Sequence, residues 1–170
     1  MSKSKTTLEI EECFLEKFPW SVQEVEIFNE IDYGLCSSWS LDVMNEMITR
    51  GFSPIEKLRR REIIDLVEFN TKGFCCYEIK VSSSDFHSKC AKTFIGNYNY
   101  YILTPEVYEK VGQEILPEIG VYIYEDKKIK LVKKAKFQVL KIDEAEFLKD
   151  ILIAVTREKL KAQGKWNPII

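Results

Sequence analysis

Two acidic residues, Asp65 and Glu78, lie at equal distances from residues 70–73, a segment with the Asn, Thr, Lys and Gly composition of a tight turn. The runs on either side of this segment are strand-like, so we expect an antiparallel hairpin about it. That hairpin places opposite each other residues 69 and 74, 67 and 76, and 65 and 78. Directly opposed residues hold their Cβ atoms about 5 Å apart, and like charges at that separation destabilise a sheet. The spacing of the two carboxylates therefore predicts a divalent cation between them.

Lys80 follows Glu78 by two positions, and side chains on a strand return to the same face at every second residue. We therefore expect an aspartate, a glutamate and a lysine on one face of the hairpin, with Ile79 pointing to the other face and into the core. The neighbouring residues are strongly apolar, and a charge inside such segments is costly without a partner. This favours a functional site over the alternative, in which Glu78 and Lys80 form an exposed strand face and Asp65 pairs with an arginine.

Both helices and strands are expected along the chain, because apolar residues recur at helical spacing in some segments and at strand spacing in others. The expected helices are residues 1–18, 41–50, 85–94, 105–112 and 143–162, and the expected strands are 54–58, 62–69, 74–82, 98–105, 119–124 and 128–133. Residues 22–34 are either a strand or a helix. Asp85 and Asp143 are the expected N-caps of their helices. A helix between two strands permits a parallel crossover, so this order predicts a mixed sheet in one α/β domain, residues 1–170.

Asp65 followed by Glu78, Ile79 and Lys80 on a hairpin resembles the PD-(D/E)XK nuclease superfamily, although Ile64 stands where that superfamily often has proline. The order of elements is similar to the αβββαβ core of the same superfamily. The resemblance covers about residues 40–125, followed by a C-terminal hairpin and helix. Segments that resemble small phage and prophage proteins related to MmcB-type DNA-repair proteins are residues 96–105, 116–123, 132–136 and 154–158.

The resemblance implies a restriction-endonuclease-like fold, with a central mixed sheet flanked by helices. It also implies a Mg²⁺ or Mn²⁺ ion held by Asp65, Glu78 and the carbonyl oxygen of Ile79, since both ions prefer oxygen ligands. Lys80 would orient or help to deprotonate the attacking water. Glu46, on the helix expected at 41–50, is the auxiliary acid that the superfamily pattern implies. The alternatives for that place are Glu24, Glu26 and Glu30.

The net charge is −2 and the isoelectric point is near 5.7, so the chain lacks the overall basic character of many nucleic-acid-binding proteins. Positive charge is concentrated locally instead. Arg60 and Arg61 directly precede the first acidic strand, and Lys89 follows the second. These three residues are candidates for contacts with phosphate groups. A second cluster comprises Lys127, Lys128, Lys130, Lys133, Lys134 and Lys136, and for both clusters a solvated rim is the alternative.

The cysteine pattern and the hydropathy of the chain predict a cytoplasmic protein with no membrane partner. The five cysteines are an odd number without a C-x-x-C pair, which fits reduced thiols, and the neighbours Cys75 and Cys76 are expected to pack on opposite faces of a strand. No run of 18 apolar residues is present, and residues 1–12 lack the apolar stretch of a signal peptide.

These observations together predict a metal-dependent nuclease that hydrolyses DNA phosphodiester bonds in phage DNA replication, recombination or repair. The alternative is a catalytically inactive DNA-binding or assembly module on the same fold. A small-molecule enzyme that uses the tyrosine-rich residues 97–101 is a third hypothesis, but no glycine-rich phosphate loop supports it. DNA is the expected partner. A second copy of the chain, as a homodimer, and phage replication or repair proteins are the other partners considered.

Overall fold

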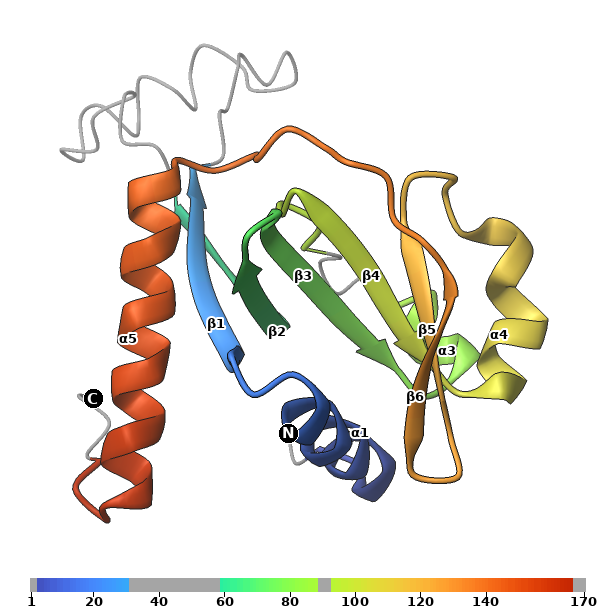
Figure 1. Cartoon of the computed structure of the whole chain (residues 1–170), viewed down its shortest axis with the longest axis horizontal. Helices are drawn as coiled ribbons and strands as arrows, with labels where there is room; N and C mark the ends of the chain where they lie inside the picture. Colours follow the sequence, from blue (N-terminus) through green and yellow to red (C-terminus); the bar gives the residue numbers. More distant parts are fainter. Residues whose placement is uncertain (1–2, 31–58, 89–92, 167–170) are drawn as a thin grey trace, which may run out of the picture. The chain divides into compact units, whose positions relative to one another are not determined.

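The computed structural model describes residues 3–30, 59–88 and 93–166 (Figure 1), without the side chains of residues 28–30, 59 and 60. Its elements are α1 Lys5–Lys17, β1 Ser21–Glu30, β2 Arg59–Asn70, β3 Gly73–Lys80, α3 Ser83–Phe86, β4 Tyr98–Leu103, α4 Pro105–Val111, η1 Gly112–Glu114, β5 Gly120–Glu125, β6 Lys128–Lys133 and α5 Glu144–Ala162. The chain divides into two compact units, residues 1–27 with 63–170, and residues 28–62.

Six strands form one mixed sheet in the order β1-β2-β3-β4-β5-β6. β2 with β3 and β5 with β6 are antiparallel pairs, whereas β3 with β4 and β4 with β5 are parallel. The crossover from β3 to β4 contains α3, and the crossover from β4 to β5 contains α4 and η1. The protein is therefore an α/β protein with a mixed sheet flanked by helices, as the sequence predicted. This arrangement is consistent with a restriction-endonuclease-like core.

The elements α1, β1, β2, β3, α3 and β4 follow one another in the order αβββαβ. The sequence predicted the same order but placed its first helix at 41–50 and its first strand at 54–58, which lie outside the described residues. In the structure the order already begins at Lys5, with α1 and β1 in the first two places. Residues 22–34, which periodicity left undecided, contribute a strand over Ser21–Glu30.

Helices pack on both faces of the sheet. On one face, Ile10 and Phe14 of α1 are fully buried against a cluster that includes Leu66, Tyr77 and Ile79. On the other face, α5 packs on β1, β2 and β3, and the short helices α3 and α4 pack on β4 and β5. Because Cys75 belongs to the first face and Cys76 to the second, the predicted opposite packing of these two neighbours is confirmed.

Most of the remaining predicted elements are confirmed, and one helix is wrong at both ends. The Pro105 helix, the hairpin of β5 and β6, and the α5 helix with its Asp143 cap, which accepts a hydrogen bond from the N of Glu146, are all present. The helix predicted over residues 85–94 instead spans Ser83–Phe86, and Ser82 is its cap. Either side chain could cap a helix, and Ser82 does so by accepting from the N of Asp85 at 3.1 Å. In the described part of the chain, no helix is long and apolar enough to cross a membrane.

Candidate active site

The hairpin of β2 and β3 has the predicted register over the part that is paired. Phe69 lies opposite Phe74 and Val67 opposite Cys76, and the pairing continues to Leu66 opposite Tyr77. It ends there, so Asp65 and Glu78, the next residues of the two strands, are not a directly opposed pair in the ladder. The carboxylate of Asp65 does not point away from the ladder: its Oδ2 accepts a hydrogen bond from the backbone N of Ile79 at 2.8 Å. Asp65 is thereby held against the strand that carries Glu78.

Glu78 is a buried acid, with 2% of its surface exposed. Its Oε1 accepts a hydrogen bond from the backbone N of Thr93 at 3.3 Å, and its Oε2 lies 3.6 Å from the Nζ of Lys80. Burial raises the pKa of Glu78, and the neighbouring negative charge of Asp65 raises it further against the opposing effect of Lys80. Burial also raises the pKa of Asp65. The two carboxyl groups therefore interact electrostatically at one site, as their spacing in the sequence indicated.

Lys80 brings an ammonium group to the same side of β3 as Glu78, and only 6% of the residue is exposed. Besides Glu78, its Nζ lies 3.7 Å from Oδ1 of Asp85 at the start of α3. Ile79, between the two charged residues, is buried in the opposite core with Tyr77. The predicted alternation of charged and core residues along this strand is confirmed.

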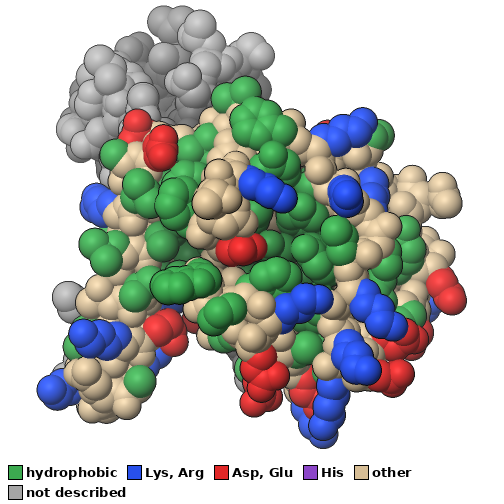
Figure 2. Space-filling view, in the orientation of Figure 1, with side chains coloured by type: hydrophobic (Ala, Val, Ile, Leu, Met, Phe, Trp, Pro, Cys, Tyr) green, Lys and Arg blue, Asp and Glu red, His purple; other side chains and the backbone are tan. Residues whose placement is uncertain are grey.

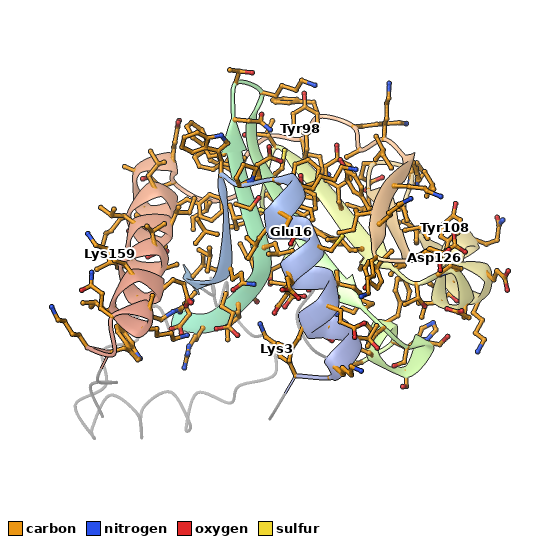
Figure 3. The ribbon with its side chains drawn as sticks, turned by 60° about the horizontal axis from the view of Figure 1, so that its bottom comes forward. Lys3, Glu16, Tyr98, Tyr108, Asp126 and Lys159 are labelled. Carbon is orange, nitrogen blue, oxygen red and sulfur yellow. The ribbon has the colours of Figure 1, made fainter. Side chains whose placement is uncertain are left out.

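Glu11, on α1, is a site residue that the sequence did not reveal. It is 3% exposed and forms an ion pair with Lys3. Burial raises the pKa of Glu11, and the negative charge of Asp65 acts in the same direction, so the two carboxylates face a common region. In Figure 3, Lys3 lies at the N-terminal end of α1. The sequence did contain an indication that Glu11 is buried. It lies three residues before the core residue Phe14, and residues at that spacing share one side of a helix.

Among the described residues, Glu11 on α1 is the candidate for the auxiliary acid that the sequence predicted on a helix. Glu46, the residue chosen for that place, lies outside the described residues. Of the alternatives, Glu24 pairs with Lys3 at 2.8 Å and Glu26 pairs with Arg157 at 3.3 Å. The side chain of Glu30 is not described.

A network of charges connects Glu11 to α5. Lys3 bridges Glu11 and Glu24, and Glu24 also lies 3.9 Å from Nη2 of Arg157. Glu24 has a φ of 50°, which non-glycine residues rarely adopt. Nη2 of Arg157 donates to the carbonyl oxygens of Gln23 and Glu24 at 3.2 and 2.7 Å, so the guanidinium satisfies the backbone at this irregular point of β1. Lys3, which pairs with both Glu24 and Glu11, connects this point of the strand to α1.

We expect Arg157→Met to lower the free energy of unfolding by about 3 kcal/mol, because two carbonyl oxygens and Glu26 would lose a buried donor while the volume stays filled. Urea unfolding measures the change. Lys161→Met is the matched control, since Lys161 is an exposed partner of Glu24 and Glu158 on the same helix. We expect it to cost less than about 0.5 kcal/mol. Equal effects of the two substitutions would contradict the structural role of Arg157.

The predicted phosphate-contacting residues are only partly described. Arg60 lies in β2, and its side chain is not described; Arg61 is exposed in the same strand. Lys89 lies outside the described residues. Asp85, the residue expected to cap the helix after the second acidic strand, pairs with Lys80.

The tyrosine-rich segment around β4 serves packing and backbone hydrogen bonding. Tyr101 is buried, and Tyr100 stacks on Tyr77 with ring centroids 5.2 Å apart. Asn97 accepts from the N of Phe74, and Asn99 bonds both the N and the O of Gly96. Tyr98 and Tyr100 are partly buried and pack against the cluster that includes Tyr77 and Ile79. Figure 2 shows hydrophobic side chains gathered over the middle of one face.

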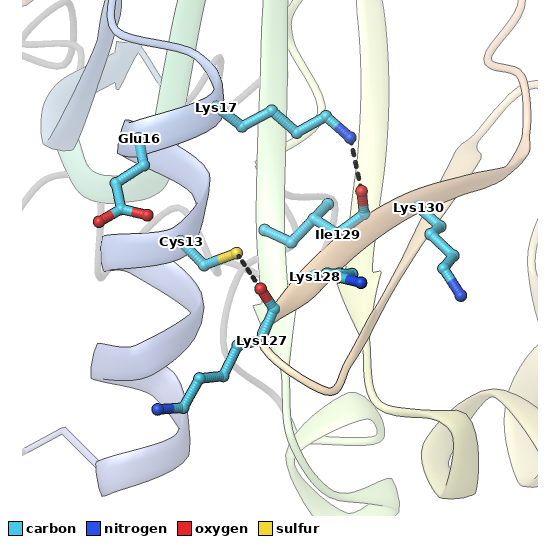
Figure 4. A pocket seen from close by; sticks show the side chains of 7 residues that line it. All are labelled: Cys13, Glu16, Lys17, Lys127, Lys128, Ile129 and Lys130. Carbon is cyan, nitrogen blue, oxygen red and sulfur yellow. Dashed lines mark hydrogen bonds between the residues drawn. The ribbon is translucent and has the colours of Figure 1, made fainter.

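A cavity of about 460 Å³ lies beside α1 and the tip of the β5–β6 hairpin, and neither Asp65 nor Glu78 lines it (Figure 4). Its lining consists of Cys13, Glu16, Lys17, Lys127, Lys128, Ile129 and Lys130. Nζ of Lys17 donates to the carbonyl oxygen of Ile129 at 2.6 Å, and Sγ of Cys13 donates to that of Lys127 at 3.3 Å. These bonds join α1, the helix that carries Glu11, to the backbone of the β5–β6 hairpin at Lys127 and Ile129.

The donor set suits a hard divalent cation. Asp65 and Glu78 provide carboxylate oxygens beside the backbone of Ile79, and burial disfavours charge on both unless a cation is close. Among the described residues, no group of three or more His, Cys, Asp or Glu side chains has metal-binding geometry. The candidate set is therefore two carboxylates and a backbone carbonyl, with Glu11 nearby on α1.

No family model matches the sequence, and no curated protein matches it either. Among solved structures, a protein of unknown function from Silicibacter pomeroyi, SPO1766, is similar with a TM-score of 0.48 and 17% identity, over 73% of this chain and 88% of that chain. A second, SSO0001, has a TM-score of 0.34 and 15% identity, over 97% of this chain and 60% of that chain. Neither similarity carries information about the site.

Proposed function

We propose that this chain is a metal-dependent nuclease that hydrolyses DNA phosphodiester bonds, in the setting of phage DNA replication, recombination or repair. The observation that supports the proposal best is the buried carboxyl group of Glu78 and the partly buried one of Asp65, which interact electrostatically, with the ammonium of Lys80 beside Glu78. All three residues come from one hairpin. The resemblance of this hairpin to the PD-(D/E)XK superfamily supplies the reaction class.

In this proposal Mg²⁺ or Mn²⁺ would be held by Asp65, Glu78 and the carbonyl oxygen of Ile79. The ion would polarise the scissile phosphate and lower the pKa of a bound water. The hydrogen bond from the N of Ile79 fixes the carboxylate of Asp65, so little reorientation is needed to bind an ion. A binding site prepared in this way loses less conformational freedom when it is filled.

In this proposal Lys80 provides the positive charge that faces the attacking water and the scissile phosphate. Its Nζ is oriented by Glu78 and Asp85, at 3.6 and 3.7 Å, and these distances leave the ammonium able to donate to a water or a phosphate oxygen. There it would orient the attacking water and stabilise the negative charge that grows on the phosphate. Glu11 would act from the helix side, as a further acceptor for water close to Asp65.

The alternative proposal is a catalytically inactive DNA-binding or assembly module. One observation favours it: Lys80 already pairs with Glu78, and Lys3 already pairs with Glu11, so internal cations compensate these acids. Such a module would bind DNA in a salt-sensitive way without a need for divalent ions.

The test is Mn²⁺ titration by calorimetry together with DNA cleavage by the purified chain. We expect Mn²⁺ binding and cleavage that chelation abolishes, and we expect Asp65→Asn to lose both. Asparagine keeps an acceptor for the N of Ile79, so the hairpin should stay folded, as a thermal melt would verify. Salt-sensitive DNA binding with no heat from Mn²⁺ would instead support the inactive module. Cleavage by Asp65→Asn at the parent rate would reject the assigned site.

A further inference from the structure

An apolar stripe runs along one side of α5. Leu148, Leu152 and Val155 are 41%, 65% and 43% exposed. Their spacing of four and then three residues places them on one line of the helix, beside the buried side formed by Phe147 and Ala154. This spacing is typical of the seam between two paired helices. In the first compact unit, the helix therefore has one side on the sheet and a second apolar side exposed.

Charges of opposite sign stand at the two ends of this stripe. Glu144 is in the first turn of α5 and Lys159 in the last turn, and both are exposed. Figure 3 shows Lys159 on the side of α5 away from the strands. The two residues are 15 positions apart in the numbering (159 − 144), which is a rise of about 22 Å along a helix. An antiparallel second α5 would bring each Glu144 to Lys159 of the other copy, whereas a parallel one would bring like charges together.

We propose that a second copy of this chain docks on the apolar stripe of α5, so that the two α5 helices pair in antiparallel orientation about a two-fold axis near Leu152. The midpoint between Glu144 and Lys159 lies between Ile151 and Leu152, which places the axis. Each Leu148 then packs against Val155 of the other copy. The same patch is used by both copies, so the interface closes as a dimer. This inference uses no residue of the candidate active site and does not depend on the proposed function.

Sedimentation velocity of the full chain tests the dimer. We expect a species of about 40 kDa, twice the chain mass of 19.9 kDa. Leu152→Glu places two like charges at the axis and should raise the dimer dissociation constant at least about 100-fold. The matched control is Ile153→Glu. Ile153 is the next residue, is 54% exposed and lies off the stripe, so this variant should remain dimeric.

Charge reversal tests the orientation. Glu144→Lys alone and Lys159→Glu alone should each weaken the dimer, by about 10-fold, because each creates two like-charge contacts. The double variant restores opposite charges across the interface and should recover the parent dissociation constant. Thermal melts verify that every variant is folded. A monomeric parent, a dimer that Leu152→Glu leaves intact, or a double variant no tighter than the single ones would overturn the proposal.

Discussion

We expect Lys80→Met to lower the rate of DNA cleavage at least about 1000-fold while Mn²⁺ binding persists. The loss follows from the position of the ammonium, whose two partners are Glu78 and Asp85 and which is only 6% exposed. Methionine fills a similar volume, so the neighbouring core should stay packed. The carboxylates of Asp65 and Glu78 remain, and removal of a competing positive charge does not weaken their attraction for a cation. Calorimetry and single-turnover cleavage measure the two properties separately.

Lys72→Met is the control for this experiment. Lys72 lies in the turn of the same hairpin and is exposed, so its loss should leave the rate close to that of the parent. If Lys80→Met cleaves as fast as Lys72→Met, Lys80 has no part in the reaction. If it instead loses Mn²⁺ binding, Lys80 organises the carboxylates and does not act on the substrate.

We expect Glu78→Gln to stabilise the metal-free protein at alkaline pH. The pKa of Glu78 is raised in the folded protein above the ordinary value of 4.5, so folding favours the protonated carboxyl group. The stability that this proton provides is fully present below pH 4.5 and is lost as the pH rises through the raised pKa. Glutamine cannot ionise, and its amide oxygen can still accept from the N of Thr93. The parent should therefore lose stability between about pH 4.5 and about pH 8, and the variant should lose much less. At about pH 9 we expect the variant to melt on the order of 5 °C higher.

Thermal melts across this pH range, with and without Mn²⁺, test the prediction. Mn²⁺ should raise the melting temperature of the parent, because it binds the folded state, and should have little effect on Glu78→Gln. A smaller pH dependence remains in the variant because burial also raises the pKa of Asp65. Glu109→Gln, at an exposed position on α4, should behave like the parent. Identical pH profiles for Glu78→Gln and the parent would show that Glu78 carries no such linkage.

The hairpin could be predicted from the sequence because two local signals agree on it. The turn at 70–73 fixes the register, and the alternation of Glu78, Ile79 and Lys80 fixes which side chains share a face. The start of the α5 helix could also be predicted from the sequence, because Asp143 and Glu146 have the spacing of a helix N-terminal cap. In both cases residues close in sequence determine the structure.

The helix side of the site could not be predicted in the same way. Glu11 is recognisable only once α1 is packed on the sheet, because its burial and its neighbour Asp65 come from contacts distant in sequence. The irregular backbone of β1 at Glu24 accepts a hydrogen bond from Arg157, more than 100 residues away in the sequence. The resemblance instead pointed to a helix at 41–50 and to Glu46, which lie outside the described residues.

The opposite packing of Cys75 and Cys76 has a practical consequence. Burial raises the pKa of both thiols, and raises that of Cys75 to about 11, so neither is a ready nucleophile at neutral pH. Their side chains belong to different hydrophobic layers, and a probe that alkylates one gains no access to the other. Modification of both sulfurs thus requires the strand to separate from everything that covers it, which makes this adjacent pair a built-in chemical reporter of how often the centre of the sheet opens.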